Sequence, residues 1–234
     1  MPDPRYAIYF TPEHRSPAER FGATILGYDC YEARPVPRVT FPDVEPENLR
    51  EITTEPRRYG FHATLKAPFR LAPSCTEIGL VQAVRNLAAT LPPVPVGLVH
   101  VATVGSFIAL IPAAASTELI LLAAECMASL DGFRAPLAEH DIARRQVSEL
   151  DARHAALLRR WGYPYVFDRF RFHMTLTGSL DPERQRAWLA RLTDAFKPLA
   201  SVPIVVDALT LLRQEGPDPA FAVVERTRLE SECG

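Results

Sequence analysis

The sequence predicts an α+β fold made of two related lobes, which together form a single domain over residues 1–234. Two observations support this prediction. The tetrapeptide His62-Ala63-Thr64-Leu65 is repeated as His173-Met174-Thr175-Leu176, and a similar order of predicted elements follows each copy. The repeats extend over about residues 57–112 and 168–226. We therefore expect a duplicated lobe whose two copies pack together.

The first motif is followed by a helix and two strands. Helix-like spacing of apolar residues predicts a helix over Thr76–Thr90. The apolar run Val94–Val104 predicts a strand, Gly105 a turn, and Phe107–Ile111 a further strand. With the motif counted as a strand, this gives a strand–helix–strand–strand unit.

The second motif is followed by the same order of elements. Asp181 is a helix-capping residue and predicts a helix that runs to about Phe196. Strands are predicted at Ile204–Leu212 and Phe221–Val224, on either side of a turn at Glu215-Gly216-Pro217. The strand–helix–strand–strand unit is therefore predicted twice.

Composition and charge limit the classes of function. With 47% hydrophobic residues among 234, the chain can bury a large core, and no change in composition marks a flexible linker. A formal net charge of −2 argues against a protein that coats nucleic acid. Local basic pairs such as Arg57-Arg58 and Arg144-Arg145 can still meet one phosphate. We therefore expect a small anionic ligand and no long nucleic acid.

Cysteine spacing and apolar runs indicate the cellular compartment. The cysteines are scattered without the spacing of a zinc site or a disulfide framework. The amino-terminal residues lack the order of a signal peptide, and no apolar run approaches the ~20 residues that span a bilayer. We therefore expect a cytoplasmic protein with free thiols and no membrane partner. The residues do not fix the oligomeric state, for which we expect a monomer.

Each motif has a polar and an apolar face when it forms a strand. Side chains alternate along a strand, so His62 and Thr64 share one face while Ala63 and Leu65 share the other. The side chains of the second motif alternate in the same way, with His173 and Thr175 on the polar face. A single His-x-Thr pair on a strand is usually structural. Two copies favour a catalytic or ligand-binding set, because a repeated fold can keep its core without keeping these polar positions.

The four polar residues suit chemistry at one phosphorus atom. If the lobes face each other, the imidazoles approach a phosphate from opposite sides, as in-line displacement requires. Histidine can accept a proton from water or donate one to a leaving oxygen, because its unperturbed pKa is near ~6.5. The hydroxyls of Thr64 and Thr175 can hold the non-bridging oxygens. This scheme needs no metal, and the residues do not decide which histidine is the acid.

Paired His-x-Thr-x motifs in a duplicated α+β chain resemble those of the two-histidine phosphoesterase superfamily. Its members include RNA 2′,3′-cyclic phosphodiesterases and RNA 2′-5′ ligase-like proteins, which act on cyclic or 2′-5′ phosphodiesters without metal. The resemblance implies antiparallel sheets around a central cleft with helices outside, and no cofactor. It also implies that His62 and His173 are catalytic and that Thr64 and Thr175 bind phosphate.

A narrower resemblance covers most of the chain and points to the family encoded beside carbon–phosphorus lyase genes. That family is associated with phosphonate metabolism, which implies a small phosphorylated sugar or nucleotide as substrate, with a ribose cyclic phosphate as the natural candidate. The segments that carry this resemblance are Arg5-Tyr6-Ala7-Ile8-Tyr9, Tyr59-Gly60-Phe61-His62-Ala63-Thr64-Leu65-Lys66-Ala67-Pro68-Phe69, Phe133-Arg134-Ala135-Pro136-Leu137, Trp161-Gly162-Tyr163-Pro164-Tyr165 and Phe170-Arg171-Phe172-His173-Met174-Thr175-Leu176-Thr177.

Four further residues are candidates for substrate binding. Lys66 and Arg171 continue the polar faces of the motifs, where a cation can contact phosphate or end at the solvent rim. Tyr9 can line the cleft, although an aromatic strand residue is more often part of the core. Tyr163, within an aromatic turn, can stack on a base or sugar or serve as packing.

No metal site is expected. The pair His140-Asp141 is similar to a metal-binding dyad of another phosphodiesterase class, but that site needs further ligands, and His154 alone does not supply them. His14 and His100 have no partner pattern and are interpreted as surface or strand-end residues.

The paired motifs are compatible with three functions. The leading hypothesis is a metal-independent cyclic phosphodiesterase with His/His acid–base catalysis. The first alternative is a nucleotide- or sugar-phosphate-binding protein without turnover, against which two symmetric titratable groups argue. The second is an RNA end-processing enzyme, against which the absence of an extended basic stripe argues.

Overall fold

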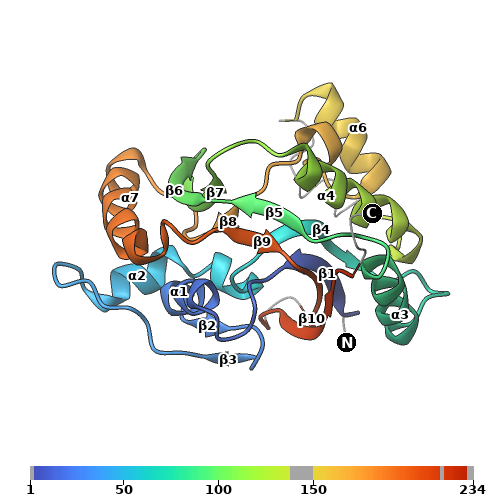
Figure 1. The fold of residues 1–234 in the computed structure, drawn as a ribbon, viewed down its shortest axis with the longest axis horizontal. Coiled ribbons are helices and arrows are strands. Elements are labelled where there is room, and N and C mark those ends of the chain that lie inside the picture. The colour runs from blue at the N-terminus through green and yellow to red at the C-terminus, as the bar shows by residue number, and fades with distance from the viewer. Residues whose placement is uncertain (1–2, 138–149, 217–218, 231–234) are drawn as a thin grey trace.

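Seven strands form the main sheet of the computed structural model, which describes residues 3–137, 150–216 and 219–230 (Figure 1). The strand order is β11-β10-β1-β4-β8-β7-β6, and all neighbours in it are antiparallel. This confirms the predicted α+β class with antiparallel pairing. The strands of this sheet are β1 (Arg5–Phe10), β4 (Ala63–Arg70), β6 (Val99–Val104), β7 (Phe107–Pro112), β8 (Met174–Thr175), β10 (Ala208–Gln214) and β11 (Ala222–Arg228).

Two small sheets, six α-helices and four short 3-10 helices complete the described fold. The small sheets pair β2 (Tyr28–Asp29) with β3 (Arg34–Pro35), and β5 (Val94–Gly97) with β9 (Ile204–Val206). The α-helices are α1 (Pro17–Leu26), α2 (Pro46–Ile52), α3 (Glu77–Ala88), α4 (Thr117–Ser129), α6 (Ala152–Trp161) and α7 (Pro182–Phe196). Among the described residues, no helix has the length and apolar character needed to cross a membrane.

The predicted helices begin at their capping residues. The side chain of Thr76 accepts a hydrogen bond from the backbone N–H of Gly79 and starts α3. The side chain of Asp181 accepts from the backbone N–H groups of Glu183 and Arg184 and starts α7, which ends at Phe196 as expected. Side-chain caps therefore mark both starts; the sequence indicated the second through Asp181 and the first through the spacing of its apolar residues.

Two predicted strands are each broken into two. The run Val94–Val104 contains Gly97, whose φ of +77° ends β5 before β6 begins. The run Ile204–Leu212 divides at Asp207 into β9 and β10. The first pieces, β5 and β9, pair with each other outside the main sheet, with Val94 opposite Val206. Each predicted strand is therefore divided where its first part leaves the main sheet to form the β5–β9 pair.

The order strand, helix, short strand, hairpin occurs after each motif, and the hairpins are exchanged. The β6–β7 hairpin lies beside β8, the motif strand of the second unit. The β10–β11 hairpin lies beside β1, which pairs with β4 of the first unit. Helix α7 packs on β6 and β7, and α3 packs on β10 and β11, so these helices lie at opposite ends of the sheet (Figure 1).

The two halves of the sheet meet at the motif strands. The resemblance implied antiparallel sheets around a central cleft; in the structure β4 and β8 are hydrogen-bonded neighbours in one sheet, with Ala63 opposite Met174. One hydrophobic core continues across this junction, since it contains Leu65 and Met174 together with Leu80 of α3 and Leu192 of α7. The division into two duplicated lobes stays a prediction.

Candidate active site

His62 and Thr64 lie on the solvent-facing side of β4. Ala63 and Leu65 are buried in the core, whereas His62 and Thr64 are only half-buried, as strand alternation requires. Both residues line a cavity of about 660 Å³, which we call the main cavity. Its wall also includes Tyr9, Tyr59, Phe107, Tyr163 and Thr175. The polar face of the first motif therefore opens into a space large enough for a small ligand.

The register of β4 and β8 places the two motifs in a crossed arrangement. Because Ala63 is opposite Met174 in an antiparallel pair, their neighbours fall into two cross-strand positions. His62 is opposite Thr175, and Thr64 is opposite His173. Residues opposite each other have Cβ atoms about 4.5–5.5 Å apart. Each histidine therefore has the threonine of the other motif as its neighbour across the strands.

The two imidazoles are held by the same type of backbone contact. His62 Nδ1 lies 2.9 Å from the carbonyl oxygen of Gly60, and His173 Nδ1 lies 2.8 Å from that of Arg171. A carbonyl can only accept, so Nδ1 carries the proton in both rings. In the neutral ring, Nε2 is then a proton acceptor. Nε2 of His62 lies 3.2 Å from Thr64 Oγ1, which can donate to it.

The backbone support of His62 depends on a glycine. Gly60 has a φ of +71°, which favours glycine, and a Cβ there would lie 2.7 Å from Cys30 Cβ. The backbone just before β4 packs closely on the β2–β3 turn at Cys30, and this packing fixes the position of the Gly60 carbonyl. This packing sets the orientation of the His62 ring.

Tyr9 covers one face of His62. The ring centroids are 3.7 Å apart with an interplanar angle of 22°, and Tyr9 is 1% exposed. Burial lowers the pKa of His62 to about 4, with a further lowering from the charge of His173 and an opposing effect of the hydrogen bond to Gly60. His62 is therefore neutral near pH 7.

His173 lies at the border between two cavities. Its ring contacts Phe107, which lines the main cavity, with a centroid distance of 5.6 Å. His173 itself lines a second cavity of about 460 Å³, the side cavity, together with Arg171, Thr103 and Ser116. Burial lowers the pKa of His173, and the hydrogen bond to the Arg171 carbonyl opposes this. The structure thus places His62, Thr64 and Thr175 at the main cavity, whereas His173 lines the side cavity.

A family model described as a protein of unknown function, DUF1045, matches residues 64–222. The chain belongs to this family. The matched range includes Thr64 and the whole second motif.

Two curated relatives of this DUF1045 protein are similar over nearly its whole length. Both are named "Ribose 1,5-bisphosphate phosphokinase PhnN". The protein of Janthinobacterium sp. (strain Marseille) is 39% identical over 226 residues, which are 95% of this chain and 50% of that protein. That of Laribacter hongkongensis (strain HLHK9) is 35% identical over 217 residues, 93% of this chain and 50% of that protein. The chain spans about half the length of the relatives it matches.

A solved structure is also similar to the DUF1045 chain. It is the crystal structure of a conserved protein of unknown function from Agrobacterium tumefaciens, with a TM-score of 0.42 and 13% sequence identity. The match covers 98% of this chain and 85% of that chain.

Lys66 does not line either cavity of the DUF1045 protein, contrary to our expectation. A β-bulge separates the pairs Tyr9–Thr64 and Ile8–Lys66, so Lys66 shares the core face with Ile8. Its side chain is 1% exposed, and Nζ contacts the carbonyl of Met127 at 3.1 Å and Asp131 Oδ1 at 3.3 Å. Burial lowers the pKa of Lys66 to about 8, and Asp131 opposes this. Lys66 therefore ties β4 to the end of α4.

The other three substrate-binding candidates lie at cavity walls. Tyr9 and Tyr163 line the main cavity, and Tyr163 packs edge-to-face on Tyr165 with centroids 5.6 Å apart. Arg171 is exposed and lines the side cavity beside His173. Their roles in binding stay predictions.

The main cavity also contains residues that the sequence did not single out. Arg5 lines it, and the guanidinium Nε donates to Gln214 Oε1 at 2.8 Å. Arg5 shares a strand face with Tyr9, so alternation along β1 was a usable signal. Phe107 comes from the first residue of β7, and nothing in its local sequence marks it.

Two basic or metal-like features of the sequence, His140-Asp141 and Arg144-Arg145, lie outside the described residues. His154 Nδ1 lies 2.9 Å from Asp151 Oδ1, near the start of α6, and its ring packs against Tyr165.

Proposed function

We propose that this DUF1045 protein is a two-histidine phosphodiesterase that opens a small cyclic phosphodiester by acid–base catalysis. The observation that supports the proposal is the crossed register of the motifs, with His62 opposite Thr175 and Thr64 opposite His173. Two imidazoles with the same Nδ1 contact thereby alternate with two hydroxyls across the β4–β8 pair. We also propose the duplicated fold of that superfamily for this chain.

His62 is the proposed general base. Its lowered pKa leaves Nε2 without a proton at neutral pH, so it can accept one from the attacking water. The water oxygen then forms a bond to phosphorus. His173 is the proposed acid, because a bound phosphate anion favours its protonated form. It donates its proton to the leaving oxygen as the ring P–O bond breaks, which gives a phosphomonoester.

The two threonines are the proposed phosphate ligands. Both side chains lie beside an imidazole and line the main cavity. A hydroxyl can donate to a non-bridging oxygen and stabilise the charge that develops there, which is typically worth about 2–4 kcal/mol for a well-placed donor. The scheme places no metal at the phosphate, since four hydrogen-bonding groups already surround it.

The remaining cavity wall suits a sugar or a nucleoside. Tyr59 and Tyr163 offer ring faces or edges, and Arg5 offers a cation near them. The curated relatives carry a name that refers to a ribose phosphate. A ribose cyclic phosphate, in phosphonate catabolism, is therefore our preferred substrate. A 2′,3′-cyclic RNA end is the alternative within the same chemistry.

The kinase activity in the relatives' name is not our proposal for this chain. Those proteins are about twice as long as the matched region. One widespread nucleotide-binding motif is the P-loop, Gly-x-x-x-x-Gly-Lys-Ser/Thr. The two lysines of this sequence, Lys66 and Lys197, follow Leu and Phe rather than glycine. Phosphodiesterase chemistry fits the paired motifs better.

A substrate panel tests the proposal. The purified chain, with EDTA, is incubated with a 5-phosphoribosyl 1,2-cyclic phosphate, a 2′,3′-cyclic mononucleotide and an oligonucleotide with a cyclic phosphate end, and ³¹P NMR detects ring opening. We expect turnover of at least one small substrate. His62→Ala and His173→Ala should each lower kcat by about 10²–10⁴. His100→Ala, an exposed histidine of β6, is the matched control.

Two results would contradict the proposal. Calorimetric binding of these compounds without any product would favour a binding protein. Full activity of either histidine variant would remove the acid–base scheme.

A further inference from the structure

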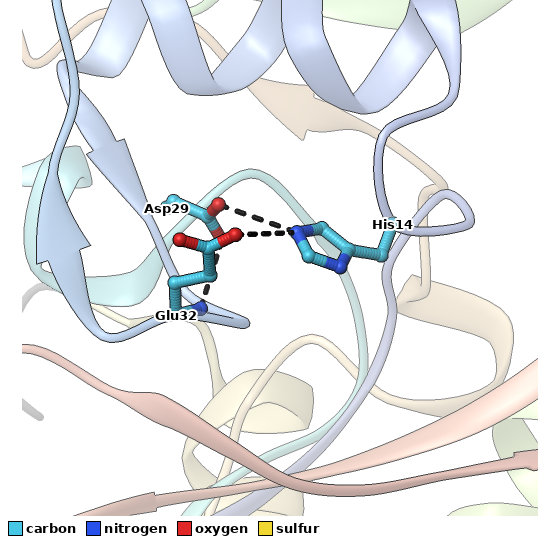
Figure 2. A group of neighbouring side chains, drawn as sticks. All are labelled: His14, Asp29 and Glu32. Atoms are coloured by element: carbon cyan, nitrogen blue, oxygen red, sulfur yellow. Dashed lines mark hydrogen bonds and ion pairs between the residues drawn. The ribbon is translucent and has the colours of Figure 1, made fainter.

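A histidine and two carboxylates meet outside the main cavity (Figure 2). His14 comes from the loop between β1 and α1, and Asp29 and Glu32 come from the β2–β3 hairpin. We interpreted His14 as a surface or strand-end residue, but its Nε2 atom is buried and has no hydrogen-bond partner in the described structure. None of the three residues lines the main cavity. The proposed catalysis therefore does not account for this cluster.

The distances within the cluster fit metal ligands better than hydrogen bonds. His14 Nε2 lies 3.4 Å from Asp29 Oδ2 and 3.7 Å from Glu32 Oε1, which is beyond good hydrogen-bond length. Two ligands of a tetrahedral zinc ion, each bound at about 2.0–2.2 Å, lie about 3.3–3.6 Å apart. The three candidate ligand atoms all lie within 4.8 Å of one another. A small shift of Glu32 would complete this geometry.

The surrounding contacts hold two of these ligands in place. The ring of Tyr31 stacks on His14, with centroids 4.7 Å apart and an angle of 17°, and its hydroxyl donates to the carbonyl of Pro12 at 2.8 Å. Asp29 Oδ1 accepts from the backbone N–H groups of Tyr31 and Glu32, at 2.8 and 3.1 Å. Its other oxygen, Oδ2, is left to face His14 (Figure 2). Outer contacts of this kind orient the ligands of metal sites.

There is also space and a further carboxylate beside the cluster. A cavity of about 220 Å³ is lined by His14, Asp29, Glu32 and Glu19. Glu19 is 6% exposed, and one of its oxygens accepts from the backbone N–H of Arg15 at 3.0 Å. An ion bound here would offset the charge of this buried carboxylate as well. The cavity leaves room for water ligands.

Two arginines now compete for Glu32. Arg15 Nη2 lies 3.1 Å from Glu32 Oε1, and Arg34 contacts the other oxygen. Both guanidinium groups are on exposed side chains, so they can leave without unpacking the core. Neither has a contact with His14 Nε2 or Asp29 Oδ2 among the described interactions. A cation at the cluster would therefore displace Arg15 from Glu32 Oε1, and Arg34 could keep its contact with Oε2.

We propose that His14, Asp29 and Glu32 bind one divalent transition-metal ion of the Zn²⁺ type, with water completing its coordination. Imidazole nitrogen and carboxylate oxygen together suit such ions. The ion would join the loop after β1 to the β2–β3 hairpin, whose Cys30 packs against Gly60. It is a structural ion that stabilises the support of His62 and takes no part in the proton transfers. The proposal does not rest on the phosphodiesterase function.

Metal binding is measured directly on the full chain without an affinity tag. After chelation and dialysis, Zn²⁺ is added in calorimetry and the bound metal is counted by elemental analysis. We expect one ion per chain and a rise in Tm on the order of 5 °C at saturating Zn²⁺. His14→Phe keeps a ring against Tyr31 but removes Nε2, and it should weaken binding more than tenfold. His100→Phe is the matched control for adventitious binding to histidine.

Two further variants keep the result interpretable if His14→Phe folds poorly. Asp29→Asn can still accept the two backbone N–H groups through its amide oxygen, yet it loses a charged ligand, so binding should again fall more than tenfold. Arg15→Ala removes the competing cation and should tighten binding. Absence of stoichiometric Zn²⁺, or equal affinity in Asp29→Asn and the wild type, would overturn the proposal. Substrate turnover is not part of the readout, so this failure is distinct from failure of the phosphodiesterase proposal.

Discussion

The ring of Tyr9 stacks on the imidazole of His62 with 3.7 Å between centroids, and this contact links the core of β1 to the proposed base. Tyr9 is fully buried, so it excludes water from one face of His62. The lowered pKa of His62 has burial as its largest cause. Tyr9 is therefore expected to act as a positioning residue that also sets the protonation state of the base.

Replacement of Tyr9 should separate these two effects. Tyr9→Leu removes the ring, so the pKa of His62 should move up from about 4 towards its ordinary value, and kcat should fall about tenfold or more. Tyr9→Phe keeps the stacked ring and should keep the pKa low. NMR titration of His62, together with the pH profile of kcat, measures both. An unchanged titration in Tyr9→Leu would show that the stack does not control the pKa.

The hydroxyls of the two motifs should contribute equally to turnover. Thr64→Val and Thr175→Val keep the branched shape of the side chain and remove only the donor. Each should lower kcat by about 10²–10³, because one oxyanion donor is worth about that factor. Thr90→Val, at an exposed position after α3, is the control. A purely structural role would instead lower Tm and leave kcat of the folded fraction unchanged.

Lys66 should be dispensable for phosphate binding. Its ammonium contacts Asp131 and the carbonyl of Met127 within the core rather than the cavity. Asp131 keeps Arg134 and Arg160 as partners when Lys66 is replaced, so no carboxylate is left alone. We expect Lys66→Met to change kcat/KM by less than about threefold, since a lost phosphate contact would cost more. A KM raised tenfold or more in steady-state kinetics would place the lysine at the substrate.

Stability should depend on pH through His62. Its pKa is near 4 in the folded chain and near ~6.5 when unfolded, so the unfolded state binds more protons between these values. The free energy of unfolding therefore falls as pH drops from about 6.5 to about 4, with a slope of at most about 1.4 kcal/mol per pH unit from this group. The side chain of Gln does not titrate, so in His62→Gln the free energy of unfolding should depend less steeply on pH between about 4 and 6.5. Urea unfolding at several pH values tests the difference, and parallel curves for both proteins would contradict it.

The sequence predicted features that depend on short stretches of chain. The apolar spacing after Thr76, the cap at Asp181 and the alternation of each motif are local, and the structure confirms the two helices and the apolar faces of the motif strands. The prediction that Lys66 lies on the polar side of the strand was wrong, because the bulge after Thr64 arises from pairing with β1. No pattern around the motif encodes that pairing.

Contacts between distant segments account for the rest. Gly97 breaks a run that reads as one strand, because its first part pairs with β9. Phe107 reaches the main cavity through a strand whose position in the sheet is set by the whole fold. His14, Asp29 and Glu32 meet through a loop and a hairpin, and their spacing in the sequence resembles no metal motif.

The exchanged hairpins make the halves of this chain mutually dependent during folding. If the chain is cut between β7 and α4, the amino-terminal fragment contains two strand pairs, β1 with β4 and β6 with β7. Strand β8, which joins these pairs in the sheet, belongs to the carboxy-terminal fragment. Each isolated fragment is expected to be largely unstructured, and mixing them should restore a native assembly. Activity recovered by such complementation would show that the proposed centre is assembled only when both pieces are present.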